Sequence, residues 1–382
     1  MKLQQLVLET FRNHQKTIVD CSLGVNIILG DNGEGKTNIL EGISYLCLSK
    51  SFCTSNDTVV TNVEATGFTA TGNFISDNKV FYNVQVTFNK LENKKLITVN
   101  KEKINKASSY IGQLPVVILS PEQSSITSGS PSNRRRFVDF IVSQSSKTYL
   151  ECLIDYRRIL KQRNKILSYM MFSHKENDET IETWNENLVR IGVIIIKKRI
   201  EFIEDFQNLI IDSYAKLTGT AELPRIFYLP SFDCATVSKE TIETTFYQML
   251  QDRYLEECRI GYTLVGPHRD EFIFQINKLD TRYFASQGQH KTFLVALKLA
   301  EFFYLKDKCK ETPIFLLDDV LSEMDKQRSQ RLLETTAELG QVFITSTDER
   351  AINWKPIASS NPRKFIIKQG RIDLVENPAQ IC

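Results

Sequence analysis

The stretch VNIILGDNGEGKT, from Val25 to Thr37, decides the fold. It opens with a short apolar run typical of a buried strand, and we expect a helix over residues 36–48 after the glycines. Residues 30–37 match the pattern Gly-x-x-x-x-Gly-Lys-Thr in the strand–loop–helix context that this pattern requires. The sequence therefore predicts a phosphate-binding loop in an α/β domain, and this context disfavours the alternative of a chance glycine-rich turn.

The chemistry of this phosphate loop (residues 30–37) indicates ATP and Mg²⁺ as cofactors. Its glycines let backbone N–H groups turn towards a phosphate chain, and the helix start adds positive potential. Lys36 should reach the outer phosphates as part of the catalytic set, and Thr37 should ligate Mg²⁺. The residues expected to contact the nucleotide here are Gly30, Asp31, Asn32, Gly33, Glu34, Gly35, Lys36, Thr37 and Asn38.

A second motif is the apolar strand expected over residues 313–317, which ends in two acids. Such a strand places carboxylates beside a phosphate loop. We expect Asp318 to hold Mg²⁺, directly or through water, and Asp319 to polarise the attacking water. Taken alone, the motif is equally consistent with a buried strand capped by solvated acids.

Two further motifs resemble parts of ABC-type ATPases. The signature segment, residues 285–289 (ASQGQ), opens a helix expected over 288–308, and a Ser hydroxyl with a Gly N–H at a helix start can bind an anion. The pentapeptide also reads as a plain N-cap. Residues 322–325 (SEMD) resemble the D-loop of the same ATPases, a role compatible with a helix N-cap.

The bulk composition excludes several other classes of protein. The chain has 382 residues, 42% of them hydrophobic and 25% charged, which is typical of a globular protein. Its eight cysteines form no CxxC pair, so a zinc site is not expected and free thiols are. The N-terminus lacks a signal peptide pattern and no apolar run reaches membrane-spanning length, so we expect a cytoplasmic, nucleoid-associated protein. Because the formal net charge is only +2, DNA binding would depend on local basic patches.

Three regions are expected along the chain: 1–123 and 259–382 as two parts of an ATPase head, and 124–258 as an inserted helical lobe. The N-terminal part carries three alternating segments, around 66–75, 80–88 and 95–100, which predict an antiparallel β layer. Within the lobe, apolar residues repeat every seven positions in two runs joined by a polar segment. This pattern favours an antiparallel helical hairpin or short coiled coil, and an ordinary pair of bundle helices remains the alternative. The repeating residues are Leu153, Leu160 and Leu167 with Tyr149, Tyr156 and Met170, and then Ile181, Leu188, Ile195, Phe202 and Leu209.

This layout resembles SMC-like ATPases, in which two halves of one head flank a coiled coil, and more narrowly the RecF family of bacterial recombination and repair ATPases. The resemblance covers essentially the whole chain. It implies a discontinuous α/β head of the ABC type with an antiparallel β layer, plus an inserted α-helical or short antiparallel coiled-coil lobe. The strings that carry it are LETFRN (residues 8–13), KTNILE (36–41), SPE (120–122) through GSPSNRRRF (129–137), and GPHRD (266–270).

The family resemblance implies a weak DNA-dependent ATPase that is used as a switch. ATP would join two copies of the chain, with Ser286, Gly288 and Gln289 of one closing the site of the other. Arg12 and Asn13 would flank the nucleotide. Thr347 is the predicted γ-phosphate sensor, since Ser346-Thr-Asp348 stands where many ABC proteins have His. Asp319 is one methylene shorter than the Glu of many ABC proteins, which suits slow hydrolysis.

Two positions depart from the family pattern or stay open. The SKSFC string at residues 49–53 stands where the family reads nearer to RSFR, so no DNA role is assigned to Cys53. Gln123 is only a candidate for the Q-loop glutamine.

The resemblance also implies partners: double-stranded DNA and single/double-strand junctions, RecR directly, RecO indirectly, and no membrane. The protein would act at gaps in recombinational repair and replication restart. The sequence contains clusters of Arg and Lys that we expect to contact DNA phosphates, and the alternative for such a cluster is a helix face exposed to solvent. Residues 134–136 could instead pair with acidic side chains. Three other classes fit less well. In a transporter subunit the signature usually lies closer to the phosphate loop, and a structural SMC protein has much longer helical arms. An SMC-like nuclease subunit would need a second cluster of metal-binding acids. The expected DNA-binding residues are Arg134, Arg135, Arg136, Arg157, Arg158, Lys161, Arg163 and Lys165.

Overall fold

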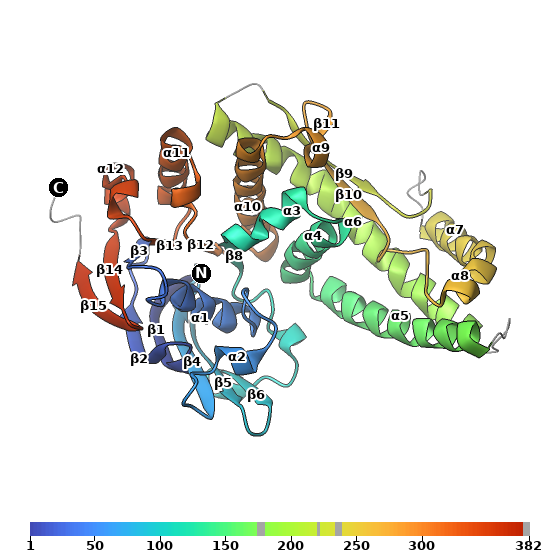
Figure 1. Cartoon of the computed structure of the whole chain (residues 1–382), viewed down its shortest axis with the longest axis horizontal. Coiled ribbons are helices and arrows are strands. Elements are labelled where there is room, and N and C mark those ends of the chain that lie inside the picture. The colour runs from blue at the N-terminus through green and yellow to red at the C-terminus, as the bar shows by residue number, and fades with distance from the viewer. Residues whose placement is uncertain (174–179, 220–221, 234–238, 377–382) are drawn as a thin grey trace. The chain divides into compact units, whose positions relative to one another are not determined.

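The computed structural model describes residues 1–173, 180–219, 222–233 and 239–376, which form two compact units (Figure 1). Unit 1 comprises Met1–Ser124, Leu209–Glu222 and Ala285–Cys382, and unit 2 comprises Ser125–Asn208 and Leu223–Phe284. The sequence-based boundary at 258/259 differs from this division, because residues 259–284 belong to unit 2 and residues 209–222 to unit 1. Two contacts explain the difference: strand 271–276 pairs within unit 2, and the Tyr214 ring lies 6.2 Å from the Phe293 ring within unit 1.

Unit 1 is built on two sheets. One is a mixed sheet whose strands β14, β3, β13, β12 and β8 run parallel, with β15 antiparallel at the edge. Its strands in spatial order are β15 (Arg371–Glu376), β14 (Arg363–Lys368), β3 (Val25–Leu29), β13 (Val342–Ser346), β12 (Ile314–Leu317) and β8 (Val116–Leu119). Every residue of β3, β13, β12 and β8 is buried, which fits the predominantly apolar sequence of these strands.

The second sheet of unit 1 is antiparallel, as the alternating segments predict. Its strands in spatial order are β2 (His14–Asp20), β1 (Lys2–Phe11), β4 (Gly67–Ile75), β5 (Phe81–Asn89), β6 (Lys94–Val99) and β7 (Glu102–Lys103). Burial alternates strictly along β4, with one face on the core, and this is the period-2 pattern visible in the sequence.

Helix α1 (Lys36–Leu48) lies between the two sheets and contacts β13 on one side and β1, β4 and β5 on the other. Nearly all of its residues are buried, which explains its apolar character on every face. The close packing needs Gly42, because a Cβ there would meet Leu8 Cδ2 at 2.6 Å. The core of unit 1 therefore holds the start of α1, and with it the phosphate loop, in a defined position.

Three other helices of unit 1 matter for the site. They are α10 (Gln287–Cys309), α11 (Lys326–Ala337) and the four-residue α2 (Asp57–Val60). Helix α10 begins one residue before its predicted start, and α10 and α11 each have a side-chain N-cap, Ser286 and Asp325 respectively.

Unit 2 combines helices with a small antiparallel sheet. The sheet contains β11 (Leu279–Asp280), β10 (Glu271–Ile276) and β9 (Pro224–Leu229) in that order. Its longer helices are α4 (Pro131–Ser145), α5 (Lys147–Ser173), α6 (Ile181–Thr218, of which the last residues belong to unit 1), α7 (Lys239–Asp252) and α8 (Tyr254–Ile260). None of the helices in the described part of the chain is long and apolar enough to cross a membrane.

The predicted antiparallel pairing of α5 and α6 is confirmed by hydrogen bonds at two levels. Arg199 on α6 donates to the Tyr149 hydroxyl near the start of α5, and Arg163 donates to Asn185 near the start of α6. The pair is not isolated, because Leu167, Met170 and Ile181 share an apolar cluster with Cys258 of α8. The hairpin is thus also part of a bundle, and residues 174–179 of its polar connection lie outside the described residues.

Candidate nucleotide-binding site

Three segments far apart in the sequence meet at one edge of the parallel sheet. Strands β3, β13 and β12 are neighbours and parallel, so the residues that follow them gather at the same edge. The phosphate loop follows β3, Thr345 lies near the end of β13, and Asp318 and Asp319 follow β12. Chain order alone does not reveal that β13 lies between the other two strands.

The phosphate loop has the backbone that its glycines allow. Gly33 and Gly35 adopt φ angles of 85° and 109°, in the region where a side chain would be strained. A Cβ on Gly35 would also meet the Asn13 side chain at 2.7 Å. Gly35 caps α1 without a side chain of its own, so the first amides of the helix stay available to a phosphate.

Lys36 closes the loop from inside. Its ammonium donates hydrogen bonds to the carbonyl oxygens of Gly30 and Asp31, each at 2.9 Å. Burial lowers the pKa of Lys36, and the nearby carboxylates, Asp319 first, oppose this shift. The buried charge lacks an anionic partner at hydrogen-bonding distance among the described residues, which suits a lysine that receives phosphate oxygens.

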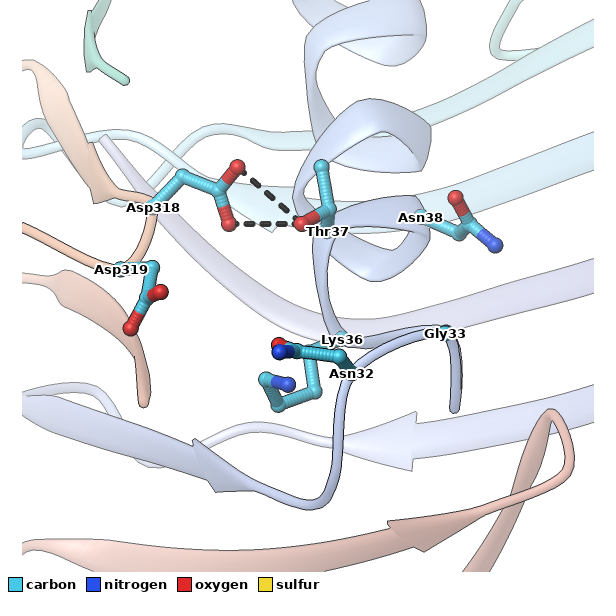
Figure 2. Close-up of a pocket in the computed structure, with 8 residues that line it drawn as sticks. Asn32, Gly33, Lys36, Thr37, Asn38, Asp318 and Asp319 are labelled. Atoms are coloured by element: carbon cyan, nitrogen blue, oxygen red, sulfur yellow. Dashed lines mark hydrogen bonds between the residues drawn. The ribbon is translucent and has the colours of Figure 1, made fainter. Parts of the chain in front are cut away.

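The loop and the paired acids line one cavity of about 150 Å³ (Figure 2). Its floor brings together the predicted metal ligands: the Thr37 hydroxyl donates to the Asp318 carboxylate at 2.8 and 3.1 Å. The lining residues are Asn32, Gly33, Gly35, Lys36, Thr37, Asn38, Asp318 and Asp319. The other predicted loop contacts, Gly30, Asp31 and Glu34, are not among the residues that line the cavity.

Asp318 is held by a second hydroxyl that the sequence analysis missed. Thr345 donates to Asp318 Oδ1 at 2.7 Å and accepts the backbone N–H of Asp319 at 2.8 Å. Burial raises the pKa of Asp318 above its ordinary value, and the two threonine hydrogen bonds counteract that shift. A cation beside this carboxylate would further favour its charged form.

The donor set fits Mg²⁺. One carboxylate and one hydroxyl oxygen lie together, and oxygen donors are what this ion prefers. The described residues include no group of three or more His, Cys, Asp or Glu side chains able to hold a metal. Such a site needs oxygens from a bound phosphate to complete the coordination, which is the usual arrangement for Mg²⁺ with nucleotides.

Asp319 stands beside this pair in a strained backbone conformation, with φ of 48°. Its Oδ1 atom is buried, and no residue in the described ranges hydrogen-bonds it. A buried acceptor without a partner is costly unless a ligand or water satisfies it. The carboxylate lines the cavity, where it can accept a hydrogen bond from a water molecule.

The Asn13 side chain hydrogen-bonds the backbone of the phosphate loop. Its side-chain amide donates to the carbonyl oxygens of Gly33 and Glu34 at 3.3 and 3.0 Å, and its Oδ1 accepts a bond from Asn38 at 2.8 Å. The Gly370 backbone amide donates to the same Glu34 carbonyl at 2.9 Å. Asn13 therefore shapes the loop in this structure.

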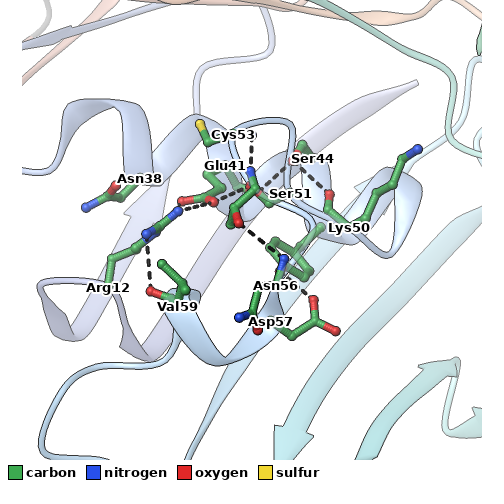
Figure 3. Close-up of polar contacts among 12 residues, drawn as sticks. Arg12, Asn38, Glu41, Ser44, Lys50, Ser51, Cys53, Asn56, Asp57 and Val59 are labelled. Carbon is green, nitrogen blue, oxygen red and sulfur yellow. Dashed lines mark hydrogen bonds and ion pairs between the residues drawn. The ribbon is translucent and has the colours of Figure 1, made fainter. Parts of the chain in front are cut away.

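Arg12 is engaged by a buried glutamate (Figure 3). Its guanidinium makes a two-point ion pair with Glu41 of α1, with both N–O distances at 2.8 Å, and donates to the Val59 carbonyl at 3.1 Å. Glu41 also accepts a hydrogen bond from Ser51. Arg12 is next to Asn13, so this network ties the loop support to the body of α1. Glu41 had no predicted role, and its place in KTNILE was the available signal.

The predicted sensor, Thr347, and the hydroxyl that bonds the paired acids, Thr345, are different residues. Thr347 is exposed, whereas Thr345 is buried and bonds both acids. The assignment of Thr347 as the γ-phosphate sensor stays a prediction. Thr345 could have been suspected as a hydroxyl at the end of an otherwise apolar strand.

The signature segment forms an exposed helix start. The Ser286 hydroxyl accepts the Gln289 backbone N–H at 3.2 Å, and the Gln289 side-chain oxygen accepts the Ser286 backbone N–H at 2.9 Å, so the plain N-cap interpretation holds in the single chain. Gly288 packs beside Arg328 of α11, whose guanidinium donates to its carbonyl at 3.4 Å. The cavity at the phosphate loop is lined by other residues of the described chain, and Ser286, Gly288 and Gln289 are not among them.

Two of the eight predicted DNA-binding cations are buried. Arg134 pairs with Glu271 at 2.5 Å, and Arg163 pairs with Glu257 at 2.6 Å, with Arg163 and Glu257 fully enclosed. A guanidinium in such a pair does not reach a phosphate, so we leave both out of the DNA surface proposed below. Arg135 is half-buried and donates to the Asp270 carbonyl at 2.6 Å. Arg136, Arg157, Arg158, Lys161 and Lys165 are exposed.

Comparison with known proteins gives one consistent family. Residues 2–356 match the family model described as the RecF/RecN/SMC N terminal domain. The chain is 39% identical over 354 residues to the DNA replication and repair protein RecF of Chloroherpeton thalassium, covering 92% of this chain and 96% of the relative. It is 40% identical over 357 residues to the protein of the same name from Prosthecochloris aestuarii, covering 93% and 95%.

Solved structures agree with the sequence matches. A structure of the recombination mediator protein RecF described as RecF-ATPrS in the RecFOR pathway superposes with a TM-score of 0.89 at 30% identity, covering 97% of each chain. The RecF-ATP structure gives 0.88 at 29% identity, covering 98% of this chain and 97% of that one. An Smc head domain from Pyrococcus furiosus matches at 0.57 and 12% identity, which supports the ABC-type head fold alone.

Proposed function

The chain belongs to the RecF family of DNA replication and repair proteins, and on that premise we propose that it is an ATP-dependent DNA-binding switch. It would act in recombinational repair and replication restart at gaps. The observation that carries the proposal is the contact of Thr37 with Asp318 at the floor of a phosphate loop. A relative solved as RecF-ATP supports ATP as the nucleotide.

ATP binding would rest on charge and backbone geometry. The free amides at the start of α1 and the Lys36 ammonium would receive the phosphates. Thr37 and Asp318 would hold Mg²⁺, which neutralises charge on the outer phosphates. Lys36 would exchange its bonds with the Gly30 and Asp31 carbonyls for bonds to phosphate oxygens, a stronger charge-assisted contact.

Hydrolysis would be slow and serve as a timer. Asp319 would orient a water molecule and accept its proton, and its unsatisfied buried Oδ1 supports this role. Lys36 would stabilise the developing charge on the phosphate. Thr347 stays our proposed γ-phosphate sensor, and Thr345 would hold both acids in place.

ATP would also join two copies of the chain. The signature segment of one copy, with the Ser286 hydroxyl and the Gly288 N–H at an exposed helix start, would bind the nucleotide held by the other. Gln289 would keep that helix start in its capped geometry. Loss of the γ-phosphate would remove the link and favour separation.

DNA would bind unit 2 through its exposed cations on α5 together with Arg136. Contacts of this kind go mainly to phosphates, so binding would be sensitive to salt and largely independent of sequence. On DNA in the cytoplasm the protein would recruit RecR, and through it RecO, to load a recombinase. The RecFOR pathway named for the solved relatives supports these partners.

Two variants test the nucleotide part of this proposal. Lys36→Ala should abolish ATP binding in a titration with a fluorescent ATP analogue, since the buried ammonium is the main charge facing the phosphates. Asp319→Asn should bind the analogue normally and release no phosphate. Wild-type turnover by Asp319→Asn would show that the catalytic base lies elsewhere, and normal binding by Lys36→Ala would remove the phosphate loop from the account.

A further inference from the structure

The GPHRD string at residues 266–270 has no part in the nucleotide site, and most of it lies inside unit 2. His268 hydrogen-bonds the Tyr156 hydroxyl at 2.8 Å, and burial lowers the pKa of His268 to about 3, so the ring is neutral at physiological pH. Asp270 pairs with Arg199 at 3.2 Å and accepts the Ser231 N–H at 2.8 Å. These two residues stabilise the interior of unit 2. Arg269 is the one charged residue of the string that the interior does not hold.

Arg269 is exposed, yet its orientation is fixed. Its Nε and one terminal nitrogen donate to the Thr263 carbonyl at 3.0 and 2.8 Å. The guanidinium carbon lies 5.0 Å from the ring centroid of Tyr262, which is 44% exposed. A surface arginine usually samples many rotamers, whereas this one is held against an aromatic ring by two hydrogen bonds.

The same pair is attached to the helix that carries the exposed cations. The backbone N–H and the hydroxyl of Thr263 both donate to Asn164 of α5, at 2.9 and 2.7 Å. A Cβ on Gly261 would lie 3.1 Å from the Met171 sulfur, so residues 261–263 run beside α5. Asn164 is next to Lys165 and one turn from Lys161, which places the Tyr262–Arg269 pair beside the cationic row. That row consists of Arg157, Arg158, Lys161 and Lys165, all exposed, with Arg157 also 3.5 Å from Asp139.

We propose that Tyr262 and Arg269 bind an unpaired base of a DNA strand whose backbone lies on the α5 cations. The cations neutralise phosphates and do not distinguish paired from unpaired DNA. An exposed aromatic face and a guanidinium plane can stack only on a base that is free of its own stack, and such stacking tolerates any sequence. The inference rests on the proposed DNA binding and adds the residues that would select single-stranded character next to a duplex.

Two probes separate the functions of the row and the pair. One is a fluorescently labelled blunt duplex of about 20 base pairs, and the other is the same duplex with a single-stranded tail. Anisotropy titrations with ATP and Mg²⁺ should show that wild type prefers the tailed probe. Tyr262→Ala and Arg269→Ala should each weaken binding to the tailed probe about tenfold, which is the size of one lost stacking contact. Neither variant should change the affinity for the blunt duplex.

Three control variants complete the design. Tyr262→Phe keeps the ring and should keep the preference. Lys310→Ala removes an exposed cation of unit 1 and should change neither affinity. Replacing the four α5 cations by Gln should weaken both probes together, which assigns the backbone contact to the row. Thermal melts and ATP binding show that each variant is folded.

The outcomes are distinguishable. Failure of wild type to bind either probe would overturn the proposed DNA switch and this inference with it. Equal wild-type affinity for the two probes, or a Tyr262→Ala variant that keeps its preference, would overturn the inference and leave the proposed switch standing. Equal losses on both probes in Tyr262→Ala would also overturn it, since stacking on an unpaired base cannot act on a blunt duplex.

Discussion

Asp318 receives hydrogen bonds from two threonines of separate elements, Thr37 at the start of α1 and Thr345 in β13. Thr37 belongs to a recognisable motif, whereas Thr345 is a β-branched residue in a strand, where threonine is common for packing reasons. Its function depends on β13 lying between β3 and β12. Most of the cavity lining was predictable, because the loop and the acids are local motifs. The supporting contacts were not predictable, since strand order determines them.

Thr345→Val tests the supporting role directly. Valine keeps the shape and removes both the bond to Asp318 and the bond from the Asp319 N–H, so the two acids lose their alignment. We expect the ATP hydrolysis rate to fall about tenfold or more, with a higher Mg²⁺ requirement. Thr345→Ser should restore most of the rate, and unchanged hydrolysis in the valine variant would show that the bonds are only structural.

Glu41 offers a second test of positioning. Glu41→Gln keeps the volume but removes the charge that holds Arg12 at two points, and the turn that carries Asn13 should loosen. We expect affinity for an ATP analogue to fall about tenfold, as is usual for outer supports of a ligand site. Asp57→Asn is a matched control, since Asp57 pairs with Lys95 and contacts no loop residue in the described structure. A melting temperature that falls while ATP affinity stays constant would contradict the positioning role.

Helix α5 shows what a periodic pattern reveals and what it hides. The heptad residues predicted the helix and its partner correctly, since Tyr149, Tyr156 and Met170 are all buried. Arg163 occupies the same register, seven residues after Tyr156 and seven before Met170, and it is buried as well. That position was the available sign that Arg163 belongs to the core and not to a cationic surface. Its ion pair with Glu257 could not be predicted, because the partner is 94 residues away.

Arg163→Ala and Arg158→Ala should therefore behave oppositely. Removing Arg163 leaves the Glu257 carboxylate buried without its partner, which typically costs about 3–5 kcal/mol of unfolding free energy. Removing the exposed Arg158 should change stability by less than about 0.5 kcal/mol and weaken DNA binding. Urea unfolding and DNA titration of both variants check this, and a destabilised Arg158→Ala with normal DNA binding would reverse the assignment.

For the whole chain, the sequence indicated the head fold, the antiparallel layer and the inserted helical lobe, all through local periodicity and motifs. It misplaced residues 259–284, because strand β10 looks like any other strand of an α/β head until its partner β9 is known. The exposed signature helix start, separate from the cavity lining, is the feature that makes a second copy necessary in our account.

The most direct test is the mass of the protein in solution by light scattering, without nucleotide and then with ATP and Mg²⁺. Asp319→Asn, which should hold ATP without hydrolysis, and Ser286→Arg, which should bind ATP but clash at the partner's site, are run beside wild type, each with and without a gapped duplex. The account predicts a monomer that becomes a dimer only with ATP, most completely in Asp319→Asn and not at all in Ser286→Arg, and a dimer that retains the DNA. A wild-type protein that binds ATP and stays monomeric, or a Ser286→Arg variant that still dimerises, would contradict it.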